Sequence, residues 1–268
     1  MALTYLACIL VSVILIFPTL WMLSTSLKDV AQVFRLPVAW LPQPPIWQNY
    51  GNALQAMPFG NYVRNSLFIV VGSTFGTMLS SSLVAYGFAR FRAPGKNALF
   101  VLVLATMMLP YAVTMIPQFV MFSKLGWVNN FNPLIIPAFF GSPFFIFLLR
   151  QFYMTIPRDL DEAAKMDGAW ALWIWFTIIL PLSKPALVTV GVFSAIWTWN
   201  DYLGPLIYLS GKDNFTVAVG LAFFQGEHST DWGMLMAAST MAVVPSLIIF
   251  LLAQKYFVQG IATSGLKG

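Results

Sequence analysis

The residues with the clearest chemistry are the acidic side chains of a short polar segment between two strongly apolar stretches. The segment reads Glu162-Ala163-Ala164-Lys165-Met166-Asp167-Gly168. The carboxylate of Glu162 can accept charge-assisted hydrogen bonds from an arginine, and the two alanines let another protein approach closely. The chemistry that this segment offers is recognition of a protein partner. The alternative interpretation is an ordinary short helix at a membrane surface.

The chain offers no pattern typical of catalysis, metal binding or nucleotide binding. Its acidic residues are scattered and form no nucleophile–base arrangement, so we expect no catalytic residue and no enzyme activity. The single cysteine, Cys8, and the single histidine, His228, cannot assemble a Cys/His metal cluster. No GxxxxGK[ST] phosphate loop occurs, so we expect this chain to bind no ATP, metal or other cofactor itself.

The polar segment is predicted to form a helix over about residues 159–167. Asp159 can serve as the N-cap, with Glu162 at the N3 position of a capping box. Asp161 and Glu162 in the first turn complement the positive end of the helix dipole. Gly168 is a natural residue just past the last turn.

The composition indicates that this helix belongs to a membrane protein. Hydrophobic residues make up 59% of the chain and charged residues 9%, whereas soluble proteins have roughly 25% charged residues. The net charge of +5 comes from single basic residues beside apolar stretches, without the basic stripe of a nucleic-acid-binding protein. No shift in composition marks a second domain, so we expect one all-α integral membrane domain over residues 1–268.

Six stretches are long and apolar enough to cross a bilayer, for which about 20 mostly apolar residues are needed. We expect them at about residues 3–26, 66–89, 98–122, 131–149, 185–209 and 232–254. The apolar run 169–180 is too short to cross, and we assign it to an interfacial or re-entering stretch.

The placement of lysine and arginine orients the chain, because cytoplasmic connections collect positive charge. With both termini in the cytoplasm, the inner side carries Arg90, Arg92, Lys96, Arg150, Arg158, Lys165, Lys184, Lys255 and Lys267. The outer side then carries Lys28, Arg35, Arg64, Lys124 and Lys212. In this orientation the helix at 159–167 is cytoplasmic and connects the fourth and fifth spans.

A second polar group lies inside the expected fifth span. It consists of Trp197, Trp199, Asn200, Asp201 and Tyr202. A carboxylate inside a membrane is costly and is normally either functional or tightly paired. Asp201 therefore either lines a solute pathway, with the aromatic residues offering faces to sugar rings, or pins helices together by hydrogen bonds.

A longer pattern gives the polar segment a family resemblance. Seven positions over twenty residues carry it: Glu162, Ala163, Ala164, Gly168, Ile178, Leu180 and Pro181. The pattern resembles the coupling-helix signature of the permease subunits of binding-protein-dependent ABC importers. Five further stretches are similar to the carbohydrate-uptake group of that family, whose model is the smaller permease subunit of the maltose transporter: 18–28, 61–66, 85–90, 197–206 and 256–268.

The resemblance implies that the chain is one subunit of a larger machine in the cytoplasmic (inner) membrane of a bacterium or archaeon. The implied partners are a second permease, two ATPase subunits that bind ATP and Mg, and a solute-binding protein outside. The implied cargo is a carbohydrate, in particular an oligosaccharide, moved by alternating access. The helix around Glu162, including Asp159, would fit a cleft of an ATPase subunit.

The resemblance also assigns roles to an outer loop and to the C-terminus. The loop after the fifth span would reach into the binding protein, with Gly211, Lys212, Gly220, Gln225, Gly226 and Glu227 as candidate contacts. The C-terminal tail, with Gly260, Gly265 and Lys267, would enter the interface between the ATPase subunits. The alternatives are a solvated connection and a frayed terminus.

Two other functions remain open on the sequence alone. The first alternative is a permease of the same superfamily that imports another solute, such as an amino acid or an anion. The spans contain few fixed charges, which argues against a strongly charged solute. A self-contained channel or secondary transporter is the alternative from a different class, and such a protein would be purified without an ATPase.

Overall fold

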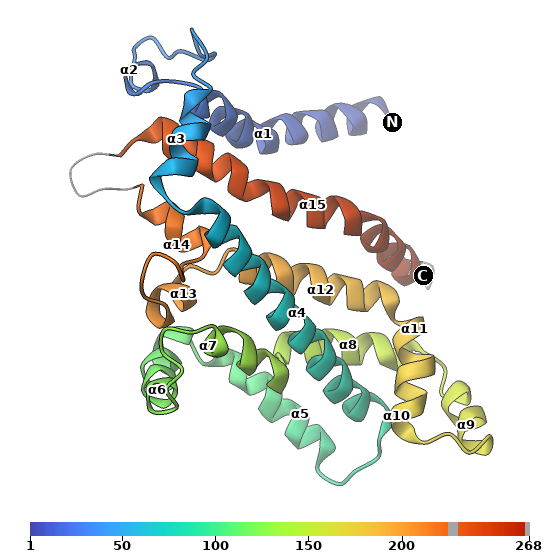
Figure 1. Cartoon of the computed structure of the whole chain (residues 1–268). Coiled ribbons are helices and arrows are strands. Elements are labelled where there is room, and N and C mark those ends of the chain that lie inside the picture. The colour runs from blue at the N-terminus through green and yellow to red at the C-terminus, as the bar shows by residue number, and fades with distance from the viewer. Residues whose placement is uncertain (225–229, 266–268) are drawn as a thin grey trace. The chain divides into compact units, whose positions relative to one another are not determined.

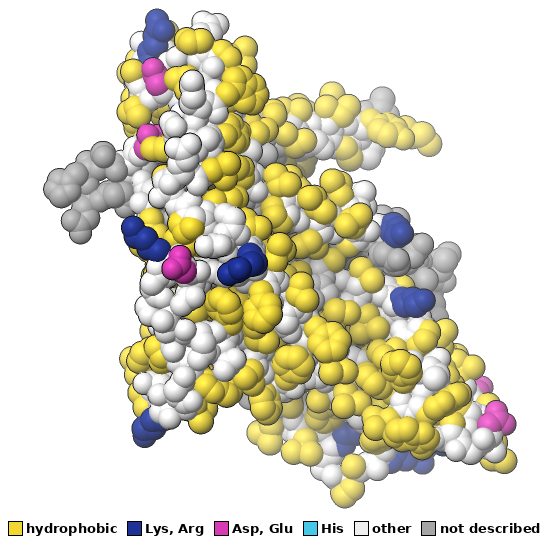
Figure 2. All heavy atoms as spheres, viewed as in Figure 1, with side chains coloured by type: hydrophobic (Ala, Val, Ile, Leu, Met, Phe, Trp, Pro, Cys, Tyr) yellow, Lys and Arg dark blue, Asp and Glu magenta, His cyan; other side chains and the backbone are white. Residues whose placement is uncertain are grey.

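The protein is all-helical in the part of the chain that the structure describes (Figure 1). The computed structural model describes residues 1–224 and 230–265, with side chains for residues 1, 3–224 and 230–255. Hydrophobic side chains cover most of the face shown in Figure 2. This surface is the reverse of that of a soluble domain, and it confirms the membrane-type composition.

Among the described residues, four helical segments are long and apolar enough to cross a membrane: Leu3–Ser26, Phe59–Arg90, Asn132–Thr155 and Trp232–Lys255. They contain the first, second, fourth and sixth expected spans. Two bent helix pairs bring the number to six if each pair is one span. The expected count of six therefore depends on those bent pairs.

The chain divides into two compact units, and the first comprises Met1–Asn65 and Gly211–Leu247. It contains α1 (Ala2–Ser26), α2 (Val30–Val33), α3 (Gln48–Ala56), α14 (Val217–Ala222) and parts of α4 (Phe59–Arg90) and α15 (Trp232–Gly265). α1 is apolar on all sides, and none of its apolar window is buried within the protein. A helix of this kind requires lipid or a partner as its surroundings.

A polar network fixes the connection that follows α1. Lys28 is 1% exposed, and its Nζ donates a hydrogen bond of 2.6 Å to the carbonyl of Ala39 and lies 4.3 Å from the ring centroid of Trp21. Burial lowers the pKa of Lys28. The side-chain amide of Asn49 donates to the carbonyls of Ser26 and Lys28, both at 2.9 Å. The network therefore ties α3 to the end of α1.

We predict that Gly233→Ala destabilises the first unit. A methyl group at Gly233 would lie 2.6 Å from Nδ2 of Asn49 and 2.7 Å from the carbonyl oxygen of Lys28, and that oxygen belongs to the backbone and cannot swing away. Overpacking of this kind costs about 1–3 kcal/mol, so the Tm of the detergent-purified protein should fall by several degrees.

The matched control for this prediction is Gly51→Ala. Gly51 lies within α3, and an added methyl group meets no described atom within 4 Å. Because alanine favours a helix over glycine by about 1 kcal/mol, this variant should keep or raise the Tm. Equal Tm values for the two variants would contradict the close approach at Gly233.

The second unit comprises Ser66–Ser210 and Ile248–Gly268. Besides parts of α4 and α15 it contains α5 (Lys96–Ala105), η1 (Thr106–Met108), α6 (Tyr111–Lys124), α7 (Asn132–Ile135), η2 (Ile136–Phe140), α8 (Pro143–Thr155), α9 (Asp159–Met166), α10 (Ala171–Ile174), the π-helical turn η3 (Trp175–Ile179), α11 (Leu180–Leu182), α12 (Lys184–Trp199) and α13 (Leu203–Tyr208).

Three expected spans have different boundaries or shapes from those predicted. The span at 98–122 is not one continuous helix, because the chain bends by 96° between η1 and α6 at Pro110, which has no N–H to continue the helix. The span at 185–209 is also interrupted, since α12 ends at Trp199 and α13 begins only at Leu203. α8 continues to Thr155, beyond the predicted end at residue 149, because Arg150 does not end a helix.

The apolar run at 169–180 is helical and separate from the span that follows it. Residues 171–182 form α10, η3 and α11, and an angle of 83° separates them from α12. The Oγ of Ser183 donates to the carbonyl of Ile179 at 2.6 Å at this bend. The predicted separation of this run from the fifth span is confirmed, and its position relative to a membrane stays a prediction.

The core of the second unit contains a polar node that joins three helices. Ser82 of α4 shares a hydrogen bond of 2.9 Å with the hydroxyl of Tyr153 of α8 and accepts one of 3.0 Å from Nε1 of Trp175 in η3. All the partners are buried, and such satisfied networks favour one arrangement of a core. This node fixes the positions of α8 and η3, and α9 lies between these two elements in the chain.

Candidate protein-docking site

The helix α9 runs over Asp159–Met166, which confirms the predicted helix at about 159–167. The predicted capping box is wrong. Arg158 has helical backbone angles and occupies the N-cap position, no side-chain cap is formed in the described structure, and the amides of Asp161 and Glu162 both donate to the carbonyl of Arg158. The helix therefore begins one residue earlier than expected, so Asp159 is its first residue and Glu162 is not at N3.

The end of α9 is a Schellman motif built on Gly168. The amide of Gly168 donates to the carbonyl of Lys165 at 3.0 Å, and that of Ala169 donates to the carbonyl of Ala164 at 2.9 Å. Gly168 has a φ of +84°, a left-handed angle that suits glycine. The predicted role of Gly168 just past the helix is confirmed.

The two faces of α9 differ. Asp161 and Ala164, three residues apart, are buried and face the unit, whereas Glu162, Ala163 and the neighbouring Met166 are exposed. Ile178 and Leu180 are half-buried against the core, and Pro181 is exposed at the start of α11. Of the signature residues, then, Glu162, Ala163, Gly168 and Pro181 are accessible to a partner, while Ile178 and Leu180 support the fold.

A hollow of about 510 Å³ adjoins α9 on one side, and we call it the apolar hollow. Its walls are Leu160, Ala163, Ala164, Asp167, Gly168, Ala169, Trp170, Trp173 and Ile178. Trp170 is 63% exposed, and Trp173 and Met166 are also exposed. Large apolar side chains exposed next to a concave surface are typical of a protein-binding site.

A second hollow of about 480 Å³, the charged hollow, lies beside the first turn of α9. It is lined by Arg90, Phe91, Arg92, Arg158, Asp161, Glu162 and Lys165. Glu162 is exposed here among basic residues, so its carboxylate can be approached by a partner. The chain thus offers a partner an acidic group on one side of α9 and an apolar recess on the other.

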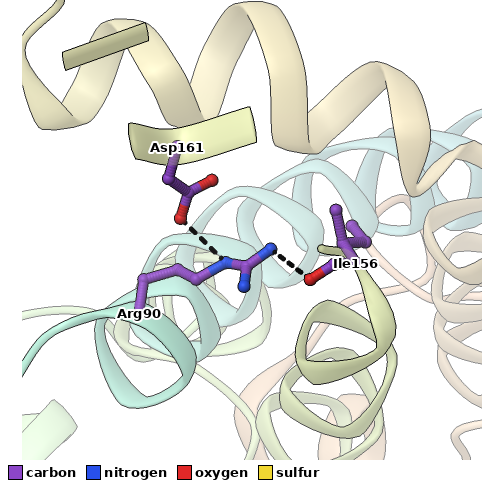
Figure 3. A network of polar contacts seen from close by, with 3 residues as sticks. All are labelled: Arg90, Ile156 and Asp161. Atoms are coloured by element: carbon purple, nitrogen blue, oxygen red, sulfur yellow. Dashed lines mark hydrogen bonds and ion pairs between the residues drawn. The ribbon is translucent and has the colours of Figure 1, made fainter. Parts of the chain in front are cut away.

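Arg90 holds α9 in place (Figure 3). Its Nε lies 3.1 Å from Oδ2 of Asp161, and its Nη2 donates to the carbonyl of Ile156 at 3.0 Å. The side chains of Arg90 and Asp161 are 4% and 7% exposed. Because Arg90 ends α4 and Ile156 is the C-cap of α8, one guanidinium joins three helices at this point.

The five polar and aromatic residues predicted inside the fifth span lie in different surroundings. Trp197 packs against Phe144 and Phe145, with ring centroids 5.5 and 5.2 Å away, and Trp199 is buried. The amide of Asn200 donates to the carbonyl of Ile196 in its own helix. The five residues therefore do not form one aromatic pathway.

Asp201 and Tyr202 lie at the break between α12 and α13. Oδ1 of Asp201 accepts a hydrogen bond of 3.1 Å from the amide of Gly204 and so caps α13, while Tyr202 is exposed. Asp201 also lines a cavity of about 500 Å³ together with Tyr111 and Tyr208. This hydrogen bond joins residues that are close in sequence. It does not decide whether Asp201 lines a solute pathway or pins helices together, so both predictions stay open.

A comparison with models of protein families finds one that covers most of the chain. The family is described as "Binding-protein-dependent transport system inner membrane component", and its model matches residues 72–263. The chain belongs to this family. The matched region includes α9, the apolar hollow and the charged hollow, so the candidate docking site lies within the part of the chain that matches the family.

The permease is similar to curated relatives along nearly its whole length. It is 35% identical over 257 residues to "Probable ABC transporter permease protein YurM" of Bacillus subtilis, covering 94% of this chain and 84% of the relative. It is 34% identical over 266 residues to "Arabinooligosaccharides transport system permease protein AraQ" of Bacillus subtilis, covering 97% and 93%. These matches confirm the resemblance to ABC importer permeases.

A solved structure has the same fold as the permease. It is the crystal structure of a bacterial ABC transporter involved in the import of the acidic polysaccharide alginate. One of its chains matches with a TM-score of 0.84 and 25% identity, covering 96% of the permease and 95% of that chain. The membership of a permease family assigns the chain a role in transport rather than in catalysis.

The predicted binding-protein loop is partly helical in the permease. Gly211 has a φ of +82° and Lys212 is exposed, but Gly220 lies inside α14, buried against the ring of Tyr62. The candidates Gln225, Gly226 and Glu227 lie outside the described residues. Gly220 thus supports packing, and Gly211 and Lys212 remain accessible candidates.

The predicted tail residues lie at the end of α15. Gly260 and Gly265 are part of this helix, and Lys267 lies outside the described residues. The helix therefore continues well beyond the expected end of the sixth span at residue 254.

Sequence reasoning about the permease missed the partner of Arg90 and the two exposed tryptophans. The sequence predicts a cytoplasmic position for Arg90, in the family-like stretch 85–90, and a complement to the helix dipole for Asp161, but it predicts no contact between them. A single arginine at the end of an apolar span and a carboxylate in the following polar helix are a signal for such a pair, but sequence does not place them side by side.

Proposed function

We propose that this permease is the membrane subunit of an ATP-driven importer that moves a carbohydrate, in particular an oligosaccharide, into the cytoplasm by alternating access. The observation that carries the proposal is the surface around α9, where an exposed carboxylate and an apolar recess flank a helix anchored by Arg90. The names of the relatives support the choice of cargo, since one carries arabinooligosaccharides in its name and the solved neighbour imports alginate.

The proposed assembly contains a second permease, two ATPase subunits and a solute-binding protein outside the membrane. The dependence on a binding protein follows the description of the family. In this proposal the chain crosses the cytoplasmic membrane of a bacterium or archaeon six times, with both termini inside. The third and fifth spans lie within the two bent helix pairs, and residues 171–182 form the interfacial or re-entering stretch that precedes the fifth span. ATP and Mg bind to the ATPase subunits.

The docking of an ATPase subunit on α9 explains the chemistry of the site. Glu162 accepts hydrogen bonds from an arginine of the ATPase, and the apolar hollow receives an apolar side chain of the same partner. When the ATPase subunits close, α9 moves with them. Arg90 passes this movement to α4 and α8, because its guanidinium contacts both α9 and the end of α8.

The proposal includes two further contacts. The loop that begins at Gly211 and Lys212 and contains Gln225, Gly226 and Glu227 reaches toward the binding protein. The tail from Gly260 through Gly265 to Lys267 enters the interface between the ATPase subunits. Both assignments rest on the similarity to importer permeases.

The test is purification of the tagged permease from its native membrane in mild detergent, followed by mass spectrometry of the proteins that accompany it. We expect an ATPase and a second permease with the native chain. The double variant Glu162→Ala, Gly168→Val should lose the ATPase and keep the second permease, because only the surface of α9 is changed.

The matched control is Gln55→Ala, which removes an exposed polar side chain of α3 in the first unit and should retain every partner. Recovery of the native chain alone, in a form that conducts solute in liposomes, would contradict the importer and support a self-contained channel or carrier.

A further inference from the structure

The second unit contains a cavity of about 500 Å³ that is separate from both hollows around α9. Residues of α6, α7, η2 and α13 line it, and these elements lie close together in Figure 1. Its volume falls within the range of about 300–1,000 Å³ that is common for small-molecule sites. The residues that matter for its chemistry are Tyr111, Gln118, Phe122, Trp127, Asp201 and Tyr208.

One wall of the cavity is a fixed aromatic surface. The rings of Phe122 and Trp127 are stacked, with centroids 5.6 Å apart and planes 16° apart. Tyr208 meets Phe122 edge to face at 5.4 Å. Rings held in this way offer a flat apolar face at little cost in side-chain entropy, which suits the apolar face of a sugar ring.

Polar groups interrupt this aromatic wall. The hydroxyl of Tyr208 is buried and lies near the phenol of Tyr111, but it makes no hydrogen bond of good geometry among the described residues. The side chain of Gln118 is half-buried at the same cavity. A buried hydroxyl without a partner costs free energy that a ligand hydroxyl can offset.

Asp201 adds an acceptor to the cavity. Its Oδ1 is used to cap Gly204, and Oδ2 lies against the Cα of the same glycine, where an added methyl group would collide with it. A carboxylate oxygen accepts more than one hydrogen bond, so Asp201 can still receive a hydroxyl of a ligand.

The chemistry of the walls selects among possible occupants. A lipid chain would offer no hydrogen bond to Gln118, Asp201 or Tyr208, which is costly in an apolar surrounding. An acidic sugar would meet the carboxylate of Asp201, and no lysine or arginine is found among the described residues that line the cavity. An uncharged sugar ring carries hydroxyl groups that can bond these polar side chains, and it brings no negative charge near Asp201.

We propose that this cavity is a binding site on this subunit for an uncharged oligosaccharide. The proposal rests on the proposed function, since it gives the carried carbohydrate a contact on this chain. One sugar ring lies against Phe122 and Trp127, and its hydroxyls bond Tyr208, Gln118 and Asp201. The chain then takes part in choosing the solute instead of only moving with its partner.

The test uses the complete transporter in proteoliposomes with its binding protein. Cys8 is the single cysteine of the chain, so Cys8→Ser gives a background into which Met121→Cys is introduced as a reporter. Met121 lines the cavity and is not one of the residues proposed to bond the sugar. The probes are arabinotriose and maltotriose as uncharged sugars and a uronic acid trisaccharide as the acidic one. Uptake of each and labelling of the reporter by a water-soluble maleimide are measured on the same vesicles.

We expect the uncharged sugar that is transported to slow labelling of the reporter about tenfold at saturation, because it excludes the reagent by mass action. The acidic trisaccharide should leave the rate unchanged. The matched control is Ser123→Cys, which lies exposed on the same helix and does not line the cavity, and its labelling should be insensitive to every sugar.

A second variant removes only one oxygen atom. Tyr208→Phe keeps the aromatic contacts and should raise the sugar concentration for half-maximal uptake roughly twofold to tenfold, the effect of one lost hydrogen bond. Tyr5→Phe, an exposed tyrosine of α1, should leave this concentration unchanged.

The outcomes separate this proposal from the proposed function. Uptake of an uncharged sugar without protection of the Met121→Cys reporter would overturn the site and leave the importer standing. A reporter that stays blocked in the absence of sugar would mean that lipid or the second permease fills the cavity, which also overturns the site. Absence of uptake for all three sugars would overturn both proposals.

Discussion

Replacing Arg90 by glutamine should reduce solute uptake about tenfold relative to ATP hydrolysis in the assembled transporter. The variant leaves the buried carboxylate of Asp161 without its counter-charge and weakens the bond to Ile156. Removing one partner of a buried ion pair costs about 3–5 kcal/mol, so α9 is held less firmly against α4 and α8. Closure of the ATPase then moves α9 without moving the spans.

A double variant distinguishes coupling from stability. Arg90→Leu with Asp161→Leu removes both buried charges, and such replacements are often neutral or stabilising. We expect its Tm to return to near that of the native chain, whereas uptake per ATP stays low because α4 and α9 are no longer joined. Recovery of both quantities would show that Arg90 serves folding only.

The control for these variants is Arg64→Gln at the other end of α4. Arg64 is exposed, so its loss should change neither the Tm nor the ratio of uptake to ATP hydrolysis. Native coupling in Arg90→Gln would rule out the role that we assign to this residue.

The second large effect is expected for Gly168→Val, which should lower uptake about tenfold while the protein still inserts and the ATPase subunits still hydrolyse ATP. Gly168 has a φ of +84°, and a side chain there costs about 1–2 kcal/mol. An added Cβ meets no described atom of this chain within 4 Å, so the new side chain projects into the space that the ATPase would occupy beside α9.

Gly95→Val controls for the backbone strain. Gly95 has a φ of +74° and also has open space around a Cβ in the described structure, but it precedes α5 and does not line the hollows at α9. Uptake and ATP hydrolysis are measured side by side for both variants. If both lose uptake equally, strain explains the effect and docking at Gly168 does not.

The long helices and α9 could be predicted from the sequence because their signals are local. α1 is a continuous apolar run, and α9 is bounded by acidic residues at one end and Gly168 at the other. The cap was displaced by one residue because Arg158, which is not a capping residue, adopts helical angles. Preferences for end positions are weak compared with the packing of Ala164 and Asp161 against the unit.

The bends and the ion pair could not be predicted because they depend on distant parts of the chain. Hydropathy measures how apolar a stretch is and carries no information on the direction of the chain. By hydropathy, Pro110, where the chain turns by 96°, cannot be distinguished from the other prolines in the spans. Arg90 and Asp161 are far apart in sequence, and only the packing of α4 against α8 and α9 brings them together. The aromatic wall at Asp201 similarly comes from α6 and α13, which are separate segments.

The two anchors of α9 have a mechanical consequence. A helix of eight residues is too short to be stable alone, so its shape depends on what holds its ends. One end is held by Arg90 through Asp161, and the other by the two backbone bonds around Gly168. In the proposed importer, a helix held in this way would move as one body when a partner presses on Glu162, and its last turn would not fray.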